Sequence, residues 1–387
     1  MKPILSLISL LCAILLTSCG GNDEPKKEKS TPHRTVLVYM IADNTLGTWD
    51  CDDADIKEML KAAEADGLNG GRLLIYHNRP GTERGNVPQL LEVTKTGLQT
   101  LKEYPDDPTI YSVSPSRIKE VLSDTKKLAK ADDYGLVLWS HANGWLESNN
   151  DIKSRSFGED RKKNISITDL GKALDGFYFS FIYFDCCLMG NIEVAYELRH
   201  ATPIIVASPT ELPIDGMPYD VNVPVFFADG VPDMSLAARN TYTSYANSVE
   251  PYCQMVVINT DWLDNLAASS RAIFNTVTEY PNDITSIQKY SIDSKCWSFD
   301  MKQYINLIAG NTILYAQWER DFDATIAYAC STPLGIGRYI NSPLVIDTYN
   351  GLGSFIIQSP DDITYKGYNN CSWYKNVVSH SPIYSQQ

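Results

Sequence analysis

The sequence predicts an α/β protein whose mostly parallel sheet is covered by helices on both faces. Apolar segments rich in β-branched residues alternate with segments of helical spacing, and the links between them are short. The strand segments are unbroken apolar runs, which is typical of strands buried on both faces. At 387 residues, the chain is long enough for two or three ordinary domains, or for one large α/β domain with a further part attached to it.

In the N-terminal part, apolar runs predict three strands, the last of them one arm of a hairpin: residues 34–41, 72–76 and 88–94. Apolar residues at helical spacing predict a helix over 53–65, between the first two strands. A second helix is predicted over 116–131, where Ser114 or Ser116 can cap the first turn.

The middle of the chain continues the alternation. Buried strands are expected at residues 134–140, 181–184 and 203–207. Helices are expected at 167–177 and 191–199. The intervening segment 147–164 is polar and carries several Lys and Arg residues, so we expect it to be an exposed loop.

Beyond residue 224 the pattern is less regular. A strand is expected at 255–258, and helices at 235–247, 263–280, 301–308 and 323–329. We expect residues 34–224 to form the main domain and residues 225–387 a C-terminal subdomain packed on it.

The charge balance excludes one class of partner. The chain has 47 acidic and 33 basic residues, a formal charge of −14, and a pI near 4.8. Nucleic-acid binding needs a basic footprint, so nucleic acid is not an expected partner. An acidic surface favours cationic ligands instead.

The first 33 residues have the features of a targeting segment followed by a tether. Lys2 precedes an apolar run over residues 4–16, which is long enough for a signal sequence and short for a membrane span. Leu16-Thr-Ser-Cys19 resembles the bacterial lipobox, in which the cysteine becomes the lipid-carrying first residue. This implies a signal peptide at 1–18, lipidation of Cys19, and a flexible tether at 19–33. The alternative is an ordinary secretory signal with an incidental cysteine.

The mature protein is therefore expected in the bacterial cell envelope, held to a membrane face by its lipid. Of nine cysteines, Cys12 leaves with the signal and Cys19 carries the lipid, so seven remain. Export permits disulfides, and an odd number leaves at least one thiol free. The sequence contains no CxxC pair, which argues against a zinc ribbon or a thioredoxin site.

Two chemically capable residues follow predicted strands. His141 comes directly after one buried strand, and Cys187 lies just past the next. Ligands of open α/β sheets bind at the carboxyl ends of the strands, so the two side chains can meet there. A cysteine near a histidine can become the nucleophile of acyl transfer. Cys186 is the adjacent rival, and a buried structural thiol or a surface histidine would be the non-catalytic alternatives.

These segments resemble the clostripain family of cysteine peptidases, which have a caspase-like fold. The resemblance rests on Ser140–Trp145 (SHANGW) and Phe184–Met189 (FDCCLM), with support from Thr35–Asn44 and from residues 207–219. Residues 372–374 match only loosely. The resemblance implies a caspase-like three-layer α/β/α sandwich with a mostly parallel central sheet, in which residues 34–224 are the catalytic domain.

The resemblance implies His141 as the catalytic histidine and Cys187 as the nucleophile, with Cys186 in the place of a small residue. The oxyanion would be held by backbone N–H groups of Ala142 and Cys187. Family members usually have glycine where this chain has Ala142. An alanine keeps the N–H, but it would be strained if the position required a positive φ.

The family likeness also implies cleavage after Arg or Lys. A pocket for such a side chain needs carboxylates, and by resemblance these are Asp185 and Asp215. The alternative is that both residues only form turns. Relatives mature by cutting themselves between the histidine and the cysteine, and here Lys153 or Arg155 is the candidate site, followed by residues 161–163. A solvated charged loop is the alternative.

No cofactor is required by this chemistry, and no metal-ligand motif is present. Calcium is the one ion that the resemblance leaves open. The acidic residues 50–55 and 361–362 do not fit an EF-hand, and we expect them to be surface charge.

Together these observations predict a monomeric, lipid-anchored cysteine endopeptidase that acts on peptides or proteins with Arg or Lys before the scissile bond. The alternative is a catalytically inactive surface-binding lipoprotein on the same scaffold, suggested by Ala142.

Overall fold

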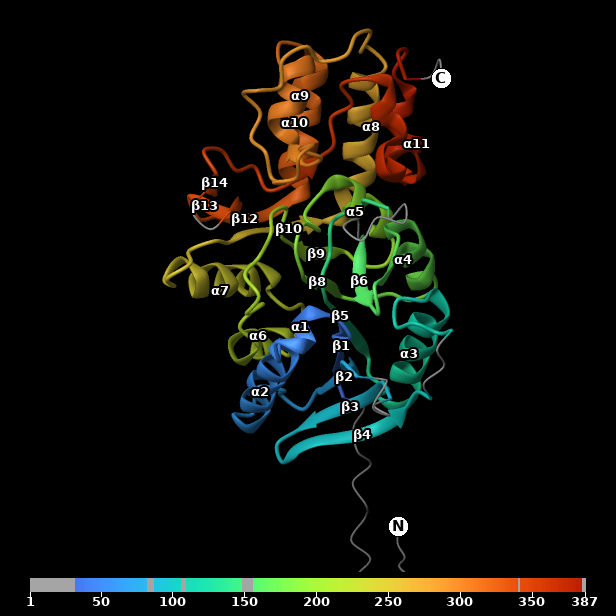
Figure 1. Cartoon of the computed structure of the whole chain (residues 1–387), viewed down its shortest axis with the longest axis vertical. Helices are drawn as coiled ribbons and strands as arrows, with labels where there is room; N and C mark the ends of the chain where they lie inside the picture. The colour runs from blue at the N-terminus through green and yellow to red at the C-terminus, as the bar shows by residue number, and fades with distance from the viewer. Residues whose placement is uncertain (1–31, 82–86, 106–108, 148–155, 340–341, 385–387) are drawn as a thin grey trace, which may run out of the picture. The chain divides into compact units, whose positions relative to one another are not determined.

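The structure is a computed structural model that describes residues 32–81, 87–105, 109–147, 156–339 and 342–384. Its centre is a nine-stranded sheet in the order β12-β10-β9-β8-β5-β1-β2-β3-β4 (Figure 1). The strands from β9 to β2 are parallel, and antiparallel strands extend the sheet at both edges. The predicted α/β architecture with a parallel centre is confirmed.

The sheet strands are β1 (Arg34–Ile41), β2 (Arg72–Asn78), β3 (Gln89–Thr94), β4 (Gly97–Glu103), β5 (Asp133–Trp139), β8 (Phe181–Asp185), β9 (Ile204–Ala207), β10 (Gln254–Asn259) and β12 (Ile326–Ser331). The helices are α1 (Thr45–Thr48), α2 (Cys51–Glu64), α3 (Pro115–Leu128), α4 (Ile167–Leu174), α5 (Ile192–Leu198), α6 (Tyr219–Phe226), α7 (Met234–Ala246), α8 (Leu263–Phe274), α9 (Met301–Ala309), α10 (Ile313–Thr325) and α11 (Ser372–Asn376). Smaller strands are β6 (Phe157–Asp160), β7 (Lys163–Ile165), β11 (Phe299–Asp300), β13 (Leu334–Tyr339), β14 (Ser342–Val345) and β15 (Gly353–Ser354).

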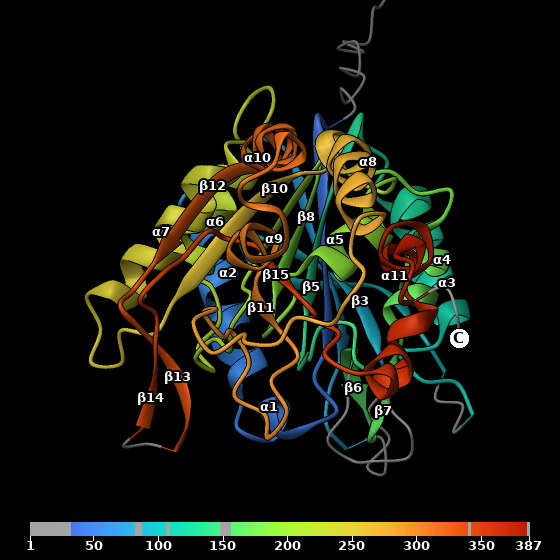
Figure 2. The same ribbon diagram turned by 90° about the horizontal axis from the view of Figure 1, so that it is seen from above.

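Two cores lie on opposite faces of the sheet, because successive strand residues point to opposite sides. Val36, Val38 and Met40 of β1 pack with α2, α6 and α7. Leu37, Tyr39 and Ile41 face the other core, which includes α3, α4 and α5. Figure 2 shows these two sets of helices on the two sides of the sheet. Strands with both faces buried explain the unbroken apolar runs in the sequence.

The prediction of a helix over residues 323–329 is wrong in its second half. Helix α10 ends at Thr325, and Ile326 begins β12, which pairs antiparallel with β10. A short apolar run fits the spacing of a helix and that of a strand equally well. Here the pairing of residues 326–331 with β10 makes them a strand. Strands β10 and β12 both follow residue 224, so the sheet continues past the predicted domain boundary.

The prediction of an exposed loop over 147–164 is wrong for residues 156–160, which are buried, whereas Lys162 and Lys163 are exposed as predicted. Residues 157–160 form the buried strand β6, which pairs with β7. The polar side chains there have partners: Asp160 accepts a hydrogen bond from the backbone N–H of Ser112 at 2.6 Å. Hydrogen bonds of this kind make it possible to bury a polar segment.

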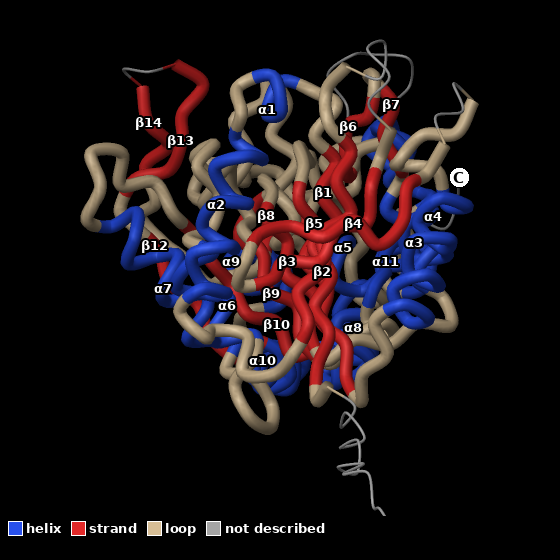
Figure 3. The backbone as a smooth tube through the Cα atoms, turned by 90° about the horizontal axis from the view of Figure 1, so that it is seen from below, coloured by secondary structure: helices blue, strands red, loops and turns tan. Residues whose placement is uncertain are grey.

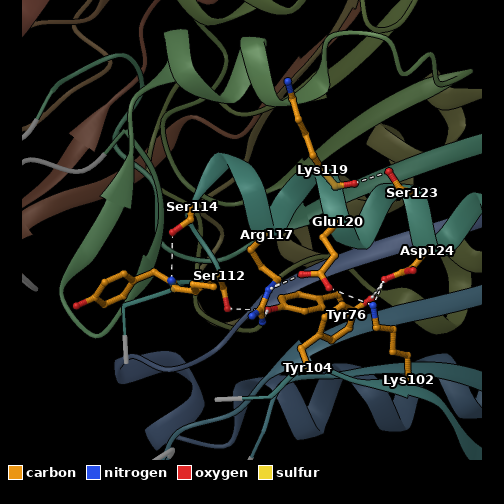
Figure 4. A network of polar contacts seen from close by, with 12 residues as sticks. Tyr76, Lys102, Tyr104, Ser112, Ser114, Arg117, Lys119, Glu120, Ser123 and Asp124 are labelled. Atoms are coloured by element: carbon orange, nitrogen blue, oxygen red, sulfur yellow. Dashed lines mark hydrogen bonds and ion pairs between the residues drawn. The ribbon is translucent and has the colours of Figure 1, made fainter. Parts of the chain in front are cut away.

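Figure 4 shows a polar network around Tyr76, Ser112 and Arg117 that joins β2 to α3 and to the residues before it. The hydroxyl of Tyr76 on β2 bonds the side chain of Ser112 at 2.9 Å, and Arg117 reaches Tyr76 at 3.5 Å. Tyr39 of β1 donates to the carbonyl of Ser112 at 2.8 Å. Because Ser112 also binds Asp160, the network fixes β6 relative to the central strands.

Helix α1, strands β6 and β7, and the β13–β14 hairpin lie at one end of the sheet (Figure 3). This is the end at which the parallel strands β1, β5 and β8 finish. Among the described residues, no helix has the length and apolar character that crossing a bilayer would need.

Candidate active site

A cavity of about 830 Å³ opens at the carboxyl ends of the central strands. Three segments supply most of its lining: Trp139–Asn143 after β5, Asp185–Leu188 after β8, and Glu211–Gly216 after β9. The cavity therefore brings together the five residues that the sequence placed in a site: His141, Ala142, Asp185, Cys187 and Asp215.

His141 is half-buried at the end of β5. Its backbone carbonyl accepts a hydrogen bond from the N–H of Gly158 in β6 at 2.9 Å. Its ring nitrogen Nε2 lies 2.7 Å from the hydroxyl of Thr45, the first residue of α1. The histidine is thus held by β6 through its backbone and bonded to α1 through its side chain.

Ala142 forms an antiparallel bridge with Phe157. The two hydrogen bonds of this bridge run from Gly158 to His141 and from Asn143 to Ser156. They use the residues on either side, so the N–H of Ala142 is not part of the ladder. Ala142 does not lie in the positive-φ region, which Gly144 occupies at 62°. The alanine is therefore accommodated without backbone strain.

Cys187 and Cys186 have different surroundings. Cys186 is buried, with 5% of its surface exposed, and belongs to the core on the α5 face. Cys187 is half-buried. The next residue, Leu188, has a φ of 64°, an uncommon conformation for a side chain of this kind. Its N–H donates to the carbonyl of Thr210 at 2.9 Å, which ties the turn to the segment after β9.

The thiol of Cys187 lies against the backbone of Leu212. It accepts from the N–H of Leu212 at 3.4 Å and donates to the carbonyl of the same residue at 3.7 Å. Burial and the nearby charge of Glu211 raise the pKa of Cys187 to about 12. In this arrangement the sulfur is a neutral thiol, and it needs a base to become a nucleophile.

Asp185 lies deep in the cavity, with 6% of its surface exposed. Its two oxygens accept from the N–H of Met217 at 3.0 Å and from the hydroxyl of Tyr219 at 2.9 Å. Gly216, with a φ of 64°, lets this turn approach, since a Cβ there would stand 3.0 Å from Asp185. Burial raises the pKa of Asp185, although its hydrogen bonds oppose the shift.

Asp55 of α2 stands behind the cavity wall. Its carboxyl oxygen accepts from the indole N–H of Trp139 at 2.6 Å, and Trp139 lines the cavity. Burial and the charge of Asp185 raise the pKa of Asp55. Two carboxyl groups so placed resist ionising together, because each disfavours the charge of the other.

The cavity is strongly acidic. Asp215 is exposed at its rim, and three further carboxylates line it: Glu211, Glu250 and Asp293. Burial and the charge of Asp293 raise the pKa of Glu211. No lysine or arginine is among the described residues that line the cavity.

The expectation that residues 50–55 and 361–362 are surface charge is wrong for three of them. Asp52 is buried and paired with His77 at 2.7 Å, and Asp55 is bonded to Trp139. Asp362 is buried, bonds Lys295, and accepts from the N–H of Gln358 at 2.9 Å. Each buried carboxylate has a partner, as burial of charge requires.

Sequence reasoning missed Thr45, Asp55 and Glu211 as contributors to the site. The helical spacing of residues 53–65 showed which face of α2 is buried. It did not show that Asp55 on this helix contacts Trp139. For Thr45, its place just past the end of β1 was an available signal, since strand ends of this sheet meet at the site.

All seven cysteines of the described part are free thiols: Cys51, Cys186, Cys187, Cys253, Cys296, Cys330 and Cys371. Within that part of the chain, no group of three or more His, Cys, Asp or Glu side chains is arranged to hold a metal ion. The predicted lipidation site Cys19 and the predicted cleavage sites Lys153 and Arg155 lie outside the described residues.

The model of the clostripain family matches residues 38–369 of this chain. The search of curated proteins found no match to this chain.

Two solved structures of C11 proteases are similar to this chain. An inactive zymogen C11 protease from Parabacteroides distasonis is 29% identical, with a TM-score of 0.78 over 90% of this chain and 99% of that one. A secreted C11 cysteine protease from Bacteroides thetaiotaomicron, in complex with an irreversible peptide inhibitor, is 27% identical, with a TM-score of 0.76 over 89% and 98% of the two chains.

Proposed function

The chain belongs to the clostripain family and is a cysteine peptidase, and from this premise we propose that it is an endopeptidase that cleaves after Arg or Lys. One observation carries the proposal: His141 and Cys187 line the same cavity as the buried Asp185 and the exposed Asp215. If these carboxylates bind the Arg or Lys side chain of a substrate, the backbone carbonyl of that same residue would lie next to the thiol of Cys187.

The reaction would begin with transfer of the Cys187 proton to His141. The thiolate attacks the substrate carbonyl, and the new C–S bond pushes an electron pair onto the oxygen. Backbone N–H groups of Ala142 and Cys187 would stabilise that oxyanion. The position of the Ala142 N–H, outside the β-ladder, supports this assignment.

The tetrahedral intermediate then loses the amine, which takes the proton from His141. Water, activated by the same histidine, hydrolyses the thioester and restores the thiol. The side chain of Cys187 must leave Leu212 for the first step, because its thiol proton is bonded to that carbonyl. The pathway needs no cofactor. We propose that the protein is a monomer that works without calcium, so a chelator should leave the rate unchanged and sedimentation should show a single chain.

The test is hydrolysis of fluorogenic peptides that end in Arg, Lys, Asp or Asn. We expect cleavage after Arg and Lys alone, because only these side chains complement the acidic cavity. Cleavage after Asp or Asn would contradict the specificity. Absence of all cleavage, even after treatment with trypsin, would favour the inactive surface-binding lipoprotein.

We also propose that Cys19 carries a lipid that holds the protein in the cell envelope. The apolar run and the small residues before this cysteine support the assignment. We expect Cys19→Ser to move the protein from the membrane fraction to the soluble fraction, as measured by immunoblot. Cys12→Ser is the matched control. Retention of Cys19→Ser on membranes at the wild-type level would disprove lipid anchoring at this residue.

Self-processing is proposed at Lys153 or Arg155, between the two catalytic residues. The specificity proposed above would allow the protein to cut itself at this site, and one similar structure is described as a zymogen. We expect the wild type to yield two chains on gels, and the double variant Lys153→Ala/Arg155→Ala to stay intact. The variant Lys162→Ala/Lys163→Ala is the control. Cleavage of the first variant at the wild-type rate would place maturation elsewhere.

A further inference from the structure

Thr45 occupies a special place beside the catalytic histidine. Its hydroxyl lies 2.7 Å from Nε2 of His141, although the two residues are far apart in sequence. A catalytic base commonly needs a further group that fixes its orientation and its tautomer. The five residues predicted for the site include no such group.

The position of Thr45 is fixed by its helix. Asn44 caps α1 by accepting from the N–H of Leu46 at 2.9 Å, and its amide donates to the carbonyls of Ile41 and Glu159, each at 2.9 Å. The same amide contacts the hydroxyl of Ser140, next to His141, at 3.3 Å. Asn44 thus joins α1 to the ends of β1 and β5 and to β6.

Close packing holds α1 from its other side. A Cβ at Gly47 would stand 2.1 Å from the carbonyl oxygen of Ala42 and 2.6 Å from the ring of Pro80. Only glycine permits this approach, so α1 sits tightly against the end of β1. The hydroxyl of Thr45 is therefore presented to His141 by a rigid support.

The hydroxyl is not part of the helix cap, which Asn44 supplies. Thr45 is also exposed, so its replacement should leave the fold intact. A variant of Thr45 can therefore change the behaviour of His141 without lowering the stability of the fold.

We propose that Thr45 is a positioning residue that accepts the Nε2–H of His141, an inference that rests on the function proposed above. With the proton on Nε2, the lone pair is on Nδ1, which can then take the proton of Cys187. When the imidazolium forms, the same hydroxyl oxygen stabilises its Nε2–H. Thr45 would thereby act in the step that generates the thiolate, not in substrate binding.

The test compares Thr45→Val, which keeps the shape of the side chain, with Thr45→Ser, which keeps the hydroxyl. Thr48→Val is the matched control, because the Thr48 hydroxyl bonds the carbonyl of Asn44 on the same helix. In the full-length protein, we expect Thr45→Val to lower kcat on an arginyl peptide about ten- to a hundredfold, with KM changed less than about twofold. Thr45→Ser should recover most of the rate, and Thr48→Val should match the wild type.

A second measurement does not depend on activity. Nitrogen NMR of the histidine rings reports the tautomer of His141, and the other four histidines serve as internal references. We expect the Nε2–H tautomer in the wild type and a mixture in Thr45→Val. An Nδ1–H tautomer in the wild type, or a tautomer unchanged in Thr45→Val, would overturn the role of Thr45. So would a serine variant as slow as the valine variant, whereas an inactive wild type with the expected tautomer would count only against the proposed function.

Discussion

Replacement of Cys187 by alanine is expected to lower hydrolysis of an arginyl peptide by at least about a thousandfold, because the acyl-enzyme cannot form without the nucleophile. Cys187→Ala should also remain a single chain wherever the wild type cuts itself. The measurement is kcat/KM with a fluorogenic peptide, together with gel analysis of the purified proteins.

Cys186→Ala is the matched control for this experiment. Cys186 is buried in the core, so its loss should lower the free energy of unfolding by about 1 kcal/mol and leave kcat/KM within a few-fold of wild type. Thermal unfolding of both variants establishes that they fold. If Cys186→Ala were the inactive variant and Cys187→Ala the active one, the assignment of the nucleophile would be reversed.

Replacement of Asp185 by asparagine is expected to lower kcat/KM for arginyl and lysyl peptides by at least about a hundredfold. The carboxylate is buried, and a buried charge pair with the substrate is worth several kcal/mol when one partner is removed. Asparagine keeps the size of the side chain and an oxygen that accepts from the N–H of Met217, and the Tyr219 hydroxyl can rotate to accept from the new amide. The variant therefore tests the charge and leaves the packing in place.

The same residue predicts a pH dependence. Burial raises the pKa of Asp185, so its carboxyl stays protonated at pH values where an exposed aspartate is already charged. Only the charged form can neutralise a guanidinium. We therefore expect kcat/KM for arginyl peptides to rise as the pH increases from the ordinary carboxyl range toward neutrality.

Asp55→Asn is the control for Asp185→Asn. It removes a carboxyl group that lies behind the cavity wall and leaves the carboxyl group inside the cavity in place. Burial and the charge of Asp185 raise the pKa of Asp55, and Asp55 contacts Trp139 and does not line the cavity. The variant should keep its activity on arginyl peptides and its pH-dependent rise, because Asp55 has the higher pKa of the two carboxyls and is uncharged where Asp185 ionises. Full activity of Asp185→Asn at every pH would remove Asp185 from the specificity pocket.

The sequence by itself determined the architecture and the place of the site. Apolar runs such as residues 34–41 predicted the strands because burial on both faces is a local, periodic property of the chain. The alternation with helices made a parallel sheet centre necessary, and parallel strands end at one edge. His141 and Cys187 each come at or just past the end of a strand, so the sequence predicted that they can meet at this edge, and the pairing of β5 with β8 brings them to one cavity.

Only the tertiary structure decided which groups surround that pair. Asp55 reaches Trp139, and Thr45 reaches His141, across 84 and 96 residues of sequence. No local period encodes such contacts, because they depend on how α1 and α2 dock on the sheet. For the same reason, residues 157–160 are too polar to be expected in a core. They are buried because their backbone pairs with β7 and with the segment after β5, and because the Ser112 backbone binds Asp160.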